Sequence, residues 1–215
     1  MAITLPHDAM AQMFDAAPSN ELPDVPNFNV CPTVQVAVVT GGEDGRRYRS
    51  MRWGFVPHWY KKPSGGPLLI NARAETLAEK PAFRSAARER RGLVALSGFY
   101  EWERSDKDKP RPWYVTRADR SPMVFATIWQ DWGEGEDTLT AFAVVTTAAN
   151  DAMARIHHRV PVILTPDQWP LWLGEAGKGA ARLMVAPPED ALDFVRVDTA
   201  VNSNRATGPD LINPI

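Results

Sequence analysis

The chain has 215 residues, of which 44% are hydrophobic and 23% charged, a composition typical of one globular domain. No apolar run approaches the roughly 18 residues of a membrane-spanning helix, and the opening residues lack the basic start and apolar core of a secretory signal. The single cysteine excludes an internal disulfide, and no cysteines and histidines have zinc-ligand spacing. We therefore expect one domain over residues 1–215, in the cytoplasm, with no metal, no cofactor and no membrane contact.

Charge is distributed unevenly along the chain, although the net charge is only −2. Residues 1–45 contain six acids and no Lys or Arg, whereas residues 46–120 contain eighteen Lys and Arg against eight acids, a local charge of +10. Residues 121–215 carry a local charge of −6. A basic third between acidic flanks is the asymmetry expected of a surface that meets phosphate. The alternative is a set of solvated surface charges that cluster by chance.

The first predicted elements are a helix, three strands and a second helix. Residues 6–16 place apolar side chains such as Met10 and Phe14 on one helical face. Residues 78–91 are predicted to form a helix with its arginines outward. The stretches that look extended are 35–40, 48–54 and 67–72.

Strands dominate the rest of the chain. They are predicted at 93–103, 112–117, 123–130, 139–146, 160–164 and 193–198. Helices are predicted at 151–157 after the cap Asn150, from Thr165-Pro166 to Gly174, and near 178–184. The pattern lacks the regular alternation of a doubly wound fold. We therefore predict an α+β fold class, with a mostly antiparallel sheet, curled or barrel-like, flanked by short helices.

Polar residues interrupt apolar strands at three places, the first being Asn71-Ala72-Arg73-Ala74-Glu75. Alternation predicts that Asn71, Arg73 and Glu75 lie on one face of an extended segment. An amide, a guanidinium and a carboxylate on one face can bind phosphate and orient a nucleophile. The alternative is a structural ion pair between Arg73 and Glu75 at a strand end.

The second place is Glu101, which lies among aromatic residues in Ser97–Trp102. A carboxyl group withdrawn from water resists ionisation, and this suits general acid/base work. The alternative is an edge-strand acid that faces solvent.

The third place is the pair His157-His158, between a predicted helix and a predicted strand. We expect the two side chains to point in different directions, and so not to chelate one metal ion. One imidazole can face a cleft and transfer protons near neutral pH. The alternative is a hydrogen-bonded structural histidine.

Aromatic residues are interleaved with the cations of the basic third. Four of the eight tryptophans lie there: Trp53, Trp59, Trp102 and Trp113. Such a mixture is what a single DNA strand stacks on and pairs with, although tryptophans are also common core residues, and we predict core positions for Trp169 and Trp172. Cys31 has no neighbouring cation or helix start to activate its thiol, so we expect a buried structural cysteine.

The order of these motifs resembles the SOS-response-associated peptidase (SRAP) family of abasic-site processing proteins. The similarity runs from about Ile3 to the C-terminus. The segments that carry it are NARAET, PAFR, SGFYEW, PWYV, FATIW, VVTTAAN, IHHRVPVIL, VNSN and GPDLI.

The resemblance implies a monomer without a cofactor that binds single-stranded DNA containing abasic sites in a positive channel. It implies a reaction in which an N-terminal cysteine forms a thiazolidine with the aldehyde of the opened sugar. Asn71 would orient the amine, Glu101 would relay protons and His157 would help to open the sugar ring. The DNA path would be lined by Trp53, Arg73, Trp102, Thr147 and Arg159.

One departure from the family pattern concerns the reactive group itself. Members begin Met-Cys-Gly-Arg and an aromatic residue, whereas this chain begins Met1-Ala2-Ile3. We expect the native start to lie upstream and to carry the cysteine. One alternative is a member that only binds single-stranded DNA without covalent capture. Another is a peptidase that acts on peptides or on its own N-terminus, and is thus a hydrolase and not a lyase-like protein.

Overall fold

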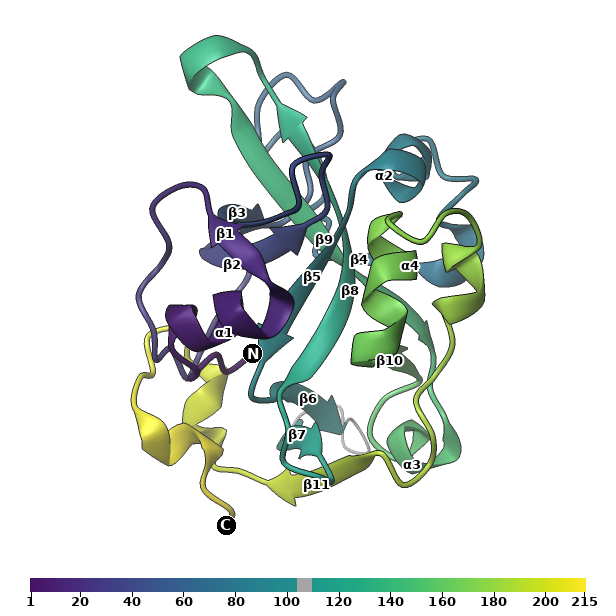
Figure 1. The fold of residues 1–215 in the computed structure, drawn as a ribbon. Coiled ribbons are helices and arrows are strands. Elements are labelled where there is room, and N and C mark those ends of the chain that lie inside the picture. Colours follow the sequence, from purple (N-terminus) through teal and green to yellow (C-terminus); the bar gives the residue numbers. More distant parts are fainter. Residues whose placement is uncertain (104–109) are drawn as a thin grey trace.

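The computed structural model describes residues 1–103 and 110–215, and its main feature is an eight-stranded mixed sheet. The strand order is β1-β3-β2-β5-β8-β9-β10, with β4 paired to β9. The strands are β1 (Ala16–Pro18), β2 (Gln35–Thr40), β3 (Arg46–Trp53), β4 (Asn71–Arg73), β5 (Arg91–Leu96), β8 (Met123–Trp132), β9 (Leu139–Ala148) and β10 (Arg159–Pro161) (Figure 1).

This sheet closes on itself. Strand β3 pairs with β2 in antiparallel fashion and also with β9 in parallel fashion, through Arg52–Ala141 and Trp53–Phe142. The path β3-β2-β5-β8-β9 therefore returns to β3, and closure of this kind removes exposed strand edges. The structure confirms the predicted α+β class and the curled, barrel-like, mostly antiparallel sheet.

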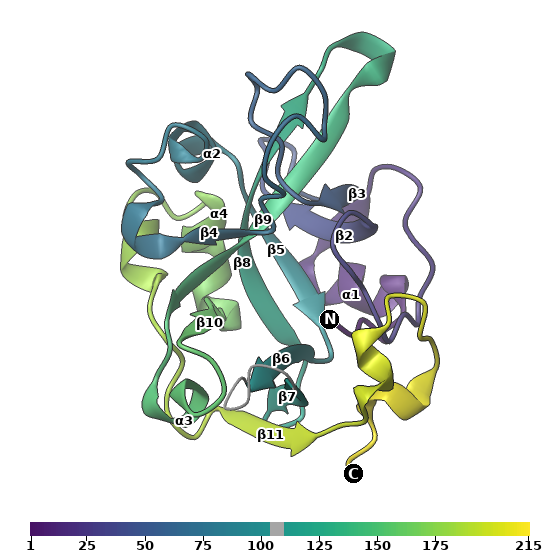
Figure 2. The same ribbon diagram turned by 180° about the vertical axis from the view of Figure 1, so that it is seen from behind.

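A second, three-stranded sheet has the order β11-β7-β6. Its strands are β6 (Phe99–Glu103), β7 (Arg111–Arg117) and β11 (Leu192–Arg196), and all of its pairings are antiparallel. The C-terminal segment that follows β11 lies beside the N-terminal third of the chain in both views (Figures 1 and 2). The two ends of the chain thus meet on one side of the molecule.

Short helices surround the sheets. The α-helices are α1 (His7–Phe14), α2 (Arg84–Glu89), α3 (Asp151–Ala154) and α4 (Trp169–Leu173). The 3-10 turns are Ala74–Thr76, Gly135–Asp137, Pro166–Gln168, Ala180–Leu183, Thr199–Asn202 and Pro209–Ile212. Trp169 and Trp172 are 6% and 1% exposed, which confirms their predicted core positions.

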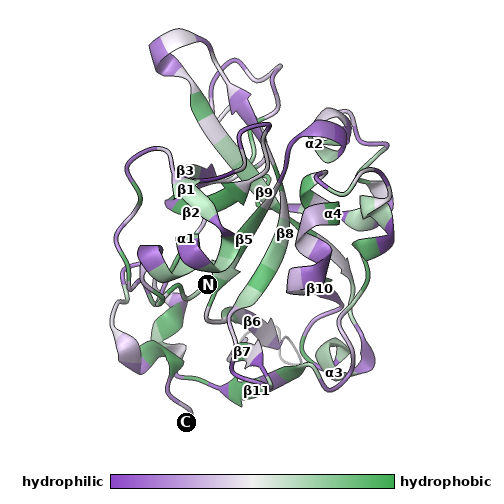
Figure 3. Cartoon of the chain, viewed as in Figure 1, coloured by the Kyte–Doolittle hydropathy of each residue, from purple (hydrophilic) through white to green (hydrophobic). Residues whose placement is uncertain are grey.

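Apolar side chains form one large buried cluster and one small one. The large cluster includes the inward residues of β2, β5, β8 and β9, and these strands carry much of the green in Figure 3. The small cluster joins Ala2 to Tyr100 and Tyr114 of the three-stranded sheet and to Val201 and Leu211 of the C-terminal segment. The second cluster therefore fastens both chain ends to the small sheet.

Several predicted elements are shorter than the sequence pattern indicated. The helix predicted over 78–91 begins only at Arg84, because Pro81 lacks an amide hydrogen and disfavours helical conformation in the residue before it. The helix predicted over 151–157 ends at Ala154, and that near 178–184 is a 3-10 turn. The strands predicted at 67–72 and 160–164 are reduced to β4 and β10.

The strand predicted over 93–103 is two strands in different sheets, β5 and β6. The chain changes sheet at Ser97-Gly98, where Ala2 forms a bridge to Gly98. A Cβ atom on Gly98 would lie 2.5 Å from the ring of Tyr114 and 2.6 Å from the carbonyl oxygen of Val115. Only glycine fits at this crossing.

We therefore predict that Gly98→Ala destabilises the protein by about 1–3 kcal/mol, the usual cost of overpacking. Chemical denaturation monitored by tryptophan fluorescence measures this free energy of unfolding. Gly42→Ala is the control, because a Cβ there would approach no atom closer than 3.3 Å. Equal stability of the two variants would contradict the close packing at Gly98.

Candidate functional site

A cavity of about 590 Å³ is lined by residues of both sheets and of both chain ends. Seven of the eight predicted site residues line it: Trp53, Asn71, Arg73, Glu101, Trp102, His157 and Arg159. Thr147 does not line the cavity, but its neighbour Thr146 does, since successive side chains of a strand point to opposite faces. Thr147 is itself buried on β9.

Glu101 and His157 form the centre of the cavity's polar wall. A Glu101 carboxylate oxygen lies 3.7 Å from Nδ1 of His157, and the two side chains are 25% and 30% exposed. The same Nδ1 lies 3.2 Å from both the backbone nitrogen and the carbonyl oxygen of Arg159. An acid and an imidazole at this distance can pass a proton between them and a bound molecule.

The two adjacent histidines lie together, contrary to the sequence-based expectation. The ring centroids of His157 and His158 are 4.4 Å apart, and both residues line the cavity. Their chain segment is the turn between α3 and β10, which is short enough to keep both rings on one side. Among the residues that the structure describes, no three His, Cys, Asp or Glu side chains gather to hold a metal ion.

Strand β4 presents Asn71 and Arg73 to the cavity, as alternation predicted. Ala72 between them is fully buried. The strand is held by parallel pairing with β9, in which Asn71 is opposite Val144 and Arg73 is opposite Thr146. Both polar side chains are exposed, so each can reach a molecule in the cavity.

Glu75 does not continue this face, because the strand ends at Arg73 and a 3-10 turn follows. Its carboxylate instead accepts two hydrogen bonds from Arg159, of 2.7 and 2.8 Å. Arg159 also donates to the carbonyl oxygen of Thr146 at 2.7 Å. The alternative pairing of Glu75 with Arg73 is therefore wrong, and the guanidinium of Arg73 has no carboxylate partner within the described part of the chain.

The Glu75–Arg159 pair fixes the turn after β4 against β10. Hydrogen bonding and charge from Arg159 lower the pKa of Glu75 to about 2. Such a bidentate arginine–carboxylate contact has a defined geometry as well as strength. The pair thereby holds the segment of Asn71 and Arg73 close to that of His157.

Two tryptophans line the cavity, and each has its indole N–H engaged. Trp53 is 9% exposed and donates to the carbonyl oxygen of Ile70 at 3.0 Å. Trp102 is half-buried and donates to Oδ1 of Asn202 at 2.7 Å. These hydrogen bonds restrict the orientation of both indole rings, whose faces can then contact a base or a sugar.

The N-terminal third supplies a wall that sequence reasoning missed. Met1, Val30 and Cys31 line the cavity, and the thiol of Cys31 donates to Asn29 at 3.6 Å. Cys31 is half-buried, so the expectation of a buried structural cysteine is wrong. The α-amine of Met1 donates to Val30 at 2.9 Å, and burial lowers its pKa to about 5.

The C-terminal segment supplies a neighbouring part of the wall through Val201, Asn202 and Asn204. In the sequence, this segment was noticed only because its VNSN motif contributes to the family resemblance. No local pattern in the sequence indicates that it lines a cavity formed by distant parts of the chain. Asn29 connects the two walls by donating to the carbonyl oxygens of Ser203 and Ala206 at 2.9 and 3.1 Å.

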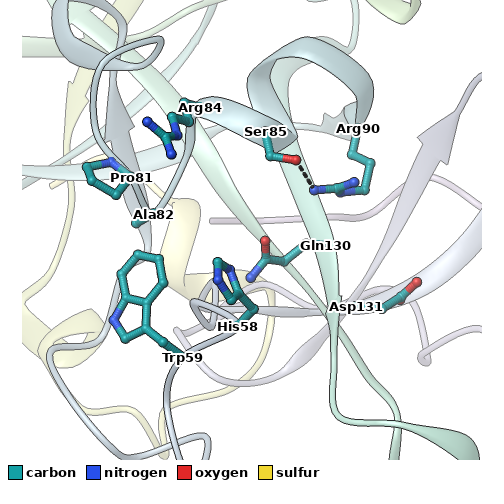
Figure 4. Close-up of a pocket in the computed structure, with 9 residues that line it drawn as sticks. All are labelled: His58, Trp59, Pro81, Ala82, Arg84, Ser85, Arg90, Gln130 and Asp131. Atoms are coloured by element: carbon teal, nitrogen blue, oxygen red, sulfur yellow. Dashed lines mark hydrogen bonds between the residues drawn. The ribbon is translucent and has the colours of Figure 1, made fainter.

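A second cavity of about 630 Å³ shares no lining residue with the first. Its wall contains Trp59, which is 50% exposed, and the guanidinium groups of Arg84 and Arg90 (Figure 4). Arg90 donates to the hydroxyl of Ser85 at 2.8 Å. Trp113, by contrast, lies away from both cavities, and its indole donates to Glu103.

The described helices are all too short or too polar to cross a lipid bilayer.

The Glu75–Arg159 pair predicts a specific acid response. Its stabilising effect is present above the ordinary carboxyl pKa of 4.5 and is lost as the pH falls through the folded value of about 2. Because Glu75 is 48% exposed, screening limits the effect to about 1 kcal/mol or less. Glu75→Gln should therefore flatten the pH dependence of the unfolding free energy across this window, as measured by urea titrations at stepped pH.

The matched control is Glu79→Gln, which changes an exposed glutamate on the next turn. It should retain the wild-type slope. An unchanged slope in Glu75→Gln would show that the ion pair does not stabilise the fold.

Comparisons with known proteins agree on one family. Residues 1–204 match the family described as SOS response associated peptidase (SRAP). The abasic site processing protein YoqW of Bacillus subtilis is 34% identical over 191 residues, which are 87% of this chain and 85% of that protein. The abasic site processing protein YedK of Escherichia coli is 30% identical over 192 residues, 87% of this chain and 84% of that protein.

The fold also matches solved structures. A crystal structure of a Bordetella bronchiseptica protein superposes with a TM-score of 0.77 at 23% identity, covering 92% of this chain and 98% of that one. A Bacteroides thetaiotaomicron protein gives a TM-score of 0.75, also at 23% identity, over 85% and 82% of the two chains. These two likenesses concern the fold alone.

Proposed function

Because the chain belongs to the SOS response associated peptidase family, we propose that it senses abasic sites in single-stranded DNA as part of the DNA damage response. The observation that carries this proposal is the convergence of Asn71, Glu101 and His157 on one cavity whose wall also holds Arg73 and Trp102. The named relatives process abasic sites, and an abasic nucleotide differs from a normal one by exposing its sugar. A cavity with an amide, an acid and an imidazole suits that sugar.

The DNA strand itself is held by cations and aromatic rings. Arg73 projects from β4 with its charge uncompensated within the described residues, so it can pair with a phosphate. Trp53 and Trp102 offer ring surfaces in the same cavity. The second cavity repeats this chemistry with Trp59 and Arg84.

The chemistry begins with the sugar aldehyde. His157 assists ring opening by moving the proton of the sugar hydroxyl, and Glu101 lies within 3.7 Å to exchange that proton with it. An amine oriented by Asn71 attacks the aldehyde carbon, and loss of water gives an imine. A thiol on the same residue then adds across the C=N bond and closes a thiazolidine ring, with its proton passing to the nitrogen.

The amine and the thiol belong to an N-terminal cysteine in the mechanism that the resemblance implies. Met1 lines the cavity, so residues joined to its α-amine would begin close to that cavity. Cys31 lines the same cavity, but its nitrogen is an amide and has no free electron pair for the attack. We propose that covalent capture requires the Met-Cys-Gly-Arg start.

The proposed binding of a DNA strand by cations and aromatic rings predicts that affinity depends on the salt concentration. Affinity for a fluorescein-labelled single strand with one abasic site should fall steeply as salt rises, because phosphate contacts release counterions. Arg73→Ala should weaken binding about three- to tenfold for every sequence and reduce the salt slope by about one. Arg120→Ala, which removes an exposed arginine paired with Asp193, is the control. An affinity independent of salt would contradict the proposed surface.

The proposed covalent capture of an abasic site predicts a protein–DNA product that survives boiling. A chain in which Met-Cys-Gly-Arg-Phe replaces Met1, with the initiator Met removed so that the cysteine carries a free α-amine, should form a protein–DNA product with an abasic strand that survives denaturing electrophoresis. The same extension with serine in place of cysteine should bind DNA and form no such product. His157→Ala in the extended chain should slow product formation about a hundredfold or more, the usual contribution of general acid/base groups, with DNA affinity retained.

Two outcomes would favour the alternative functions. DNA binding without any covalent product from the extended chain would indicate a binding module. Cleavage of peptides in trans that is lost in Glu101→Gln would indicate a peptidase in which Glu101 and His157 activate water.

A further inference from the structure

We infer that Asn202 is a positioning residue for Trp102, and that the C-terminal segment thereby sets how a nucleotide stacks in the cavity. This inference rests on the proposed function. It concerns a residue that lies 100 positions from Trp102 in the chain and contacts it through one hydrogen bond of 2.7 Å. Asn202 acts by orienting the indole ring of Trp102, and it takes no part in the reaction with the sugar.

The indole of Trp102 needs such a partner. Trp102 lies near the end of β6, in the register pair Trp102–Pro112 with β7, and its side chain is half-buried in the cavity wall. The rotation of an aromatic ring about its last side-chain bond is broad unless packing or a hydrogen bond restricts it. The N–H of the indole is the ring's one donor, and it points at Oδ1 of Asn202. This bond fixes the plane of the ring.

The backbone of Asn202 is itself anchored. It ends the 3-10 turn Thr199–Asn202, whose start is capped by the carboxylate of Asp198 on the backbone nitrogen of Ala200 at 2.7 Å. The preceding Val201 is 4% exposed and packs with Leu211 in the small buried cluster. The backbone that carries the exposed side chain of Asn202 is therefore fixed by the capped turn and by the buried Val201 next to it.

A second anchor comes from the N-terminal third. The side-chain nitrogen of Asn29 donates to the carbonyl oxygens of Ser203 and Ala206, directly after Asn202. Tyr100, two residues before Trp102 on β6, donates to the carbonyl oxygen of Phe28 at 2.7 Å. Residues 28–29 thus contact both the strand that carries Trp102 and the segment that carries Asn202. The donor and the acceptor of the hydrogen bond between Trp102 and Asn202 are therefore both attached to the same loop.

The orientation of Trp102 matters because of its neighbour Glu101. The two residues are consecutive on β6, and the backbone nitrogen of Trp102 lies 3.1 Å from a carboxylate oxygen of Glu101. Both residues line the cavity, so a base or sugar stacked on the ring lies in the same cavity as the carboxylate. Freeing the ring would loosen the stack without removing any group that takes part in proton transfer.

A double-mutant cycle tests this inference. The variants are Asn202→Ala, which removes the acceptor, Trp102→Phe, which removes the donor but keeps a stacking ring, and the double variant. The measurement is the affinity for a labelled single strand with a tetrahydrofuran abasic analogue. We expect each single variant to weaken binding about three- to tenfold, as for one lost hydrogen bond, and the double variant to be no weaker than Trp102→Phe. Additive losses would overturn the inference, because residues that act independently add.

A readout without DNA separates the two proposals. In a proton–nitrogen NMR spectrum, Trp102→Phe identifies the indole signal of Trp102, and Asn202→Ala should shift that signal and speed its exchange with water. Asn213→Ala, which removes an exposed hydrogen bond to Asp210 on the same segment, should leave it unchanged. An unmoved indole signal in Asn202→Ala would overturn the inference even if DNA binding is normal. Wild-type protein that fails to bind the strand would instead overturn the proposed function.

Asn29→Ala provides a second variant in case Asn202→Ala unfolds. It removes the support behind Asn202 and leaves the hydrogen bond between Asn202 and Trp102 formally intact. We expect a smaller loss of affinity that disappears in the Trp102→Phe background. A loss of equal size in both backgrounds would contradict a role through Trp102.

Discussion

The cavity depends above all on the backbone pairing of β9. This strand pairs with β8 and β10 in antiparallel fashion and with β3 and β4 in parallel fashion. The parallel pairing with β3 closes the sheet, and that with β4 places Asn71 opposite Val144 and Arg73 opposite Thr146. Backbone hydrogen bonds between strands are regular and leave little freedom, so one strand fixes the positions of side chains drawn from four others. Asn71, Arg73 and Arg159 all lie on strands that pair directly with β9.

The acid and the imidazole come from two different structural units. Glu101 lies on β6 of the three-stranded sheet, whereas His157 precedes β10 of the eight-stranded sheet. Their distance of 3.7 Å is therefore set by how the sheets pack and not by local geometry. Gly98, which admits no side chain because Tyr114 and Val115 of β7 lie against it, marks the point where the chain passes from β5 of one sheet to β6 of the other.

Local patterns in the sequence were sufficient for most strands and for some of the polar residues of the cavity, among them Asn71, Arg73 and Glu101. Two of these patterns are local: the alternation around Asn71 and Arg73, and the single charge of Glu101 among aromatic residues. Such patterns involve residues that are close in the sequence, so they can be recognised before the fold is known. The shortened helix at Pro81 and the sheet change at Gly98 were missed because apolar spacing continues through both breaks. The partnerships of Arg159 with Glu75 and of Trp102 with Asn202 span 84 and 100 positions. No periodic pattern carries information over such separations, so these contacts required the structure.

The small buried cluster has a consequence for how the protein is made. It joins Ala2 at one end of the chain to Leu211 at the other, and the walls that it supports hold both Met1 and Asn202. During translation, the strands of the eight-stranded sheet, the last of which ends at Pro161, are made before the C-terminal segment. The cavity gains the wall that contains Asn202 only when that later segment packs onto the small cluster. The main core can therefore form before the cavity is complete.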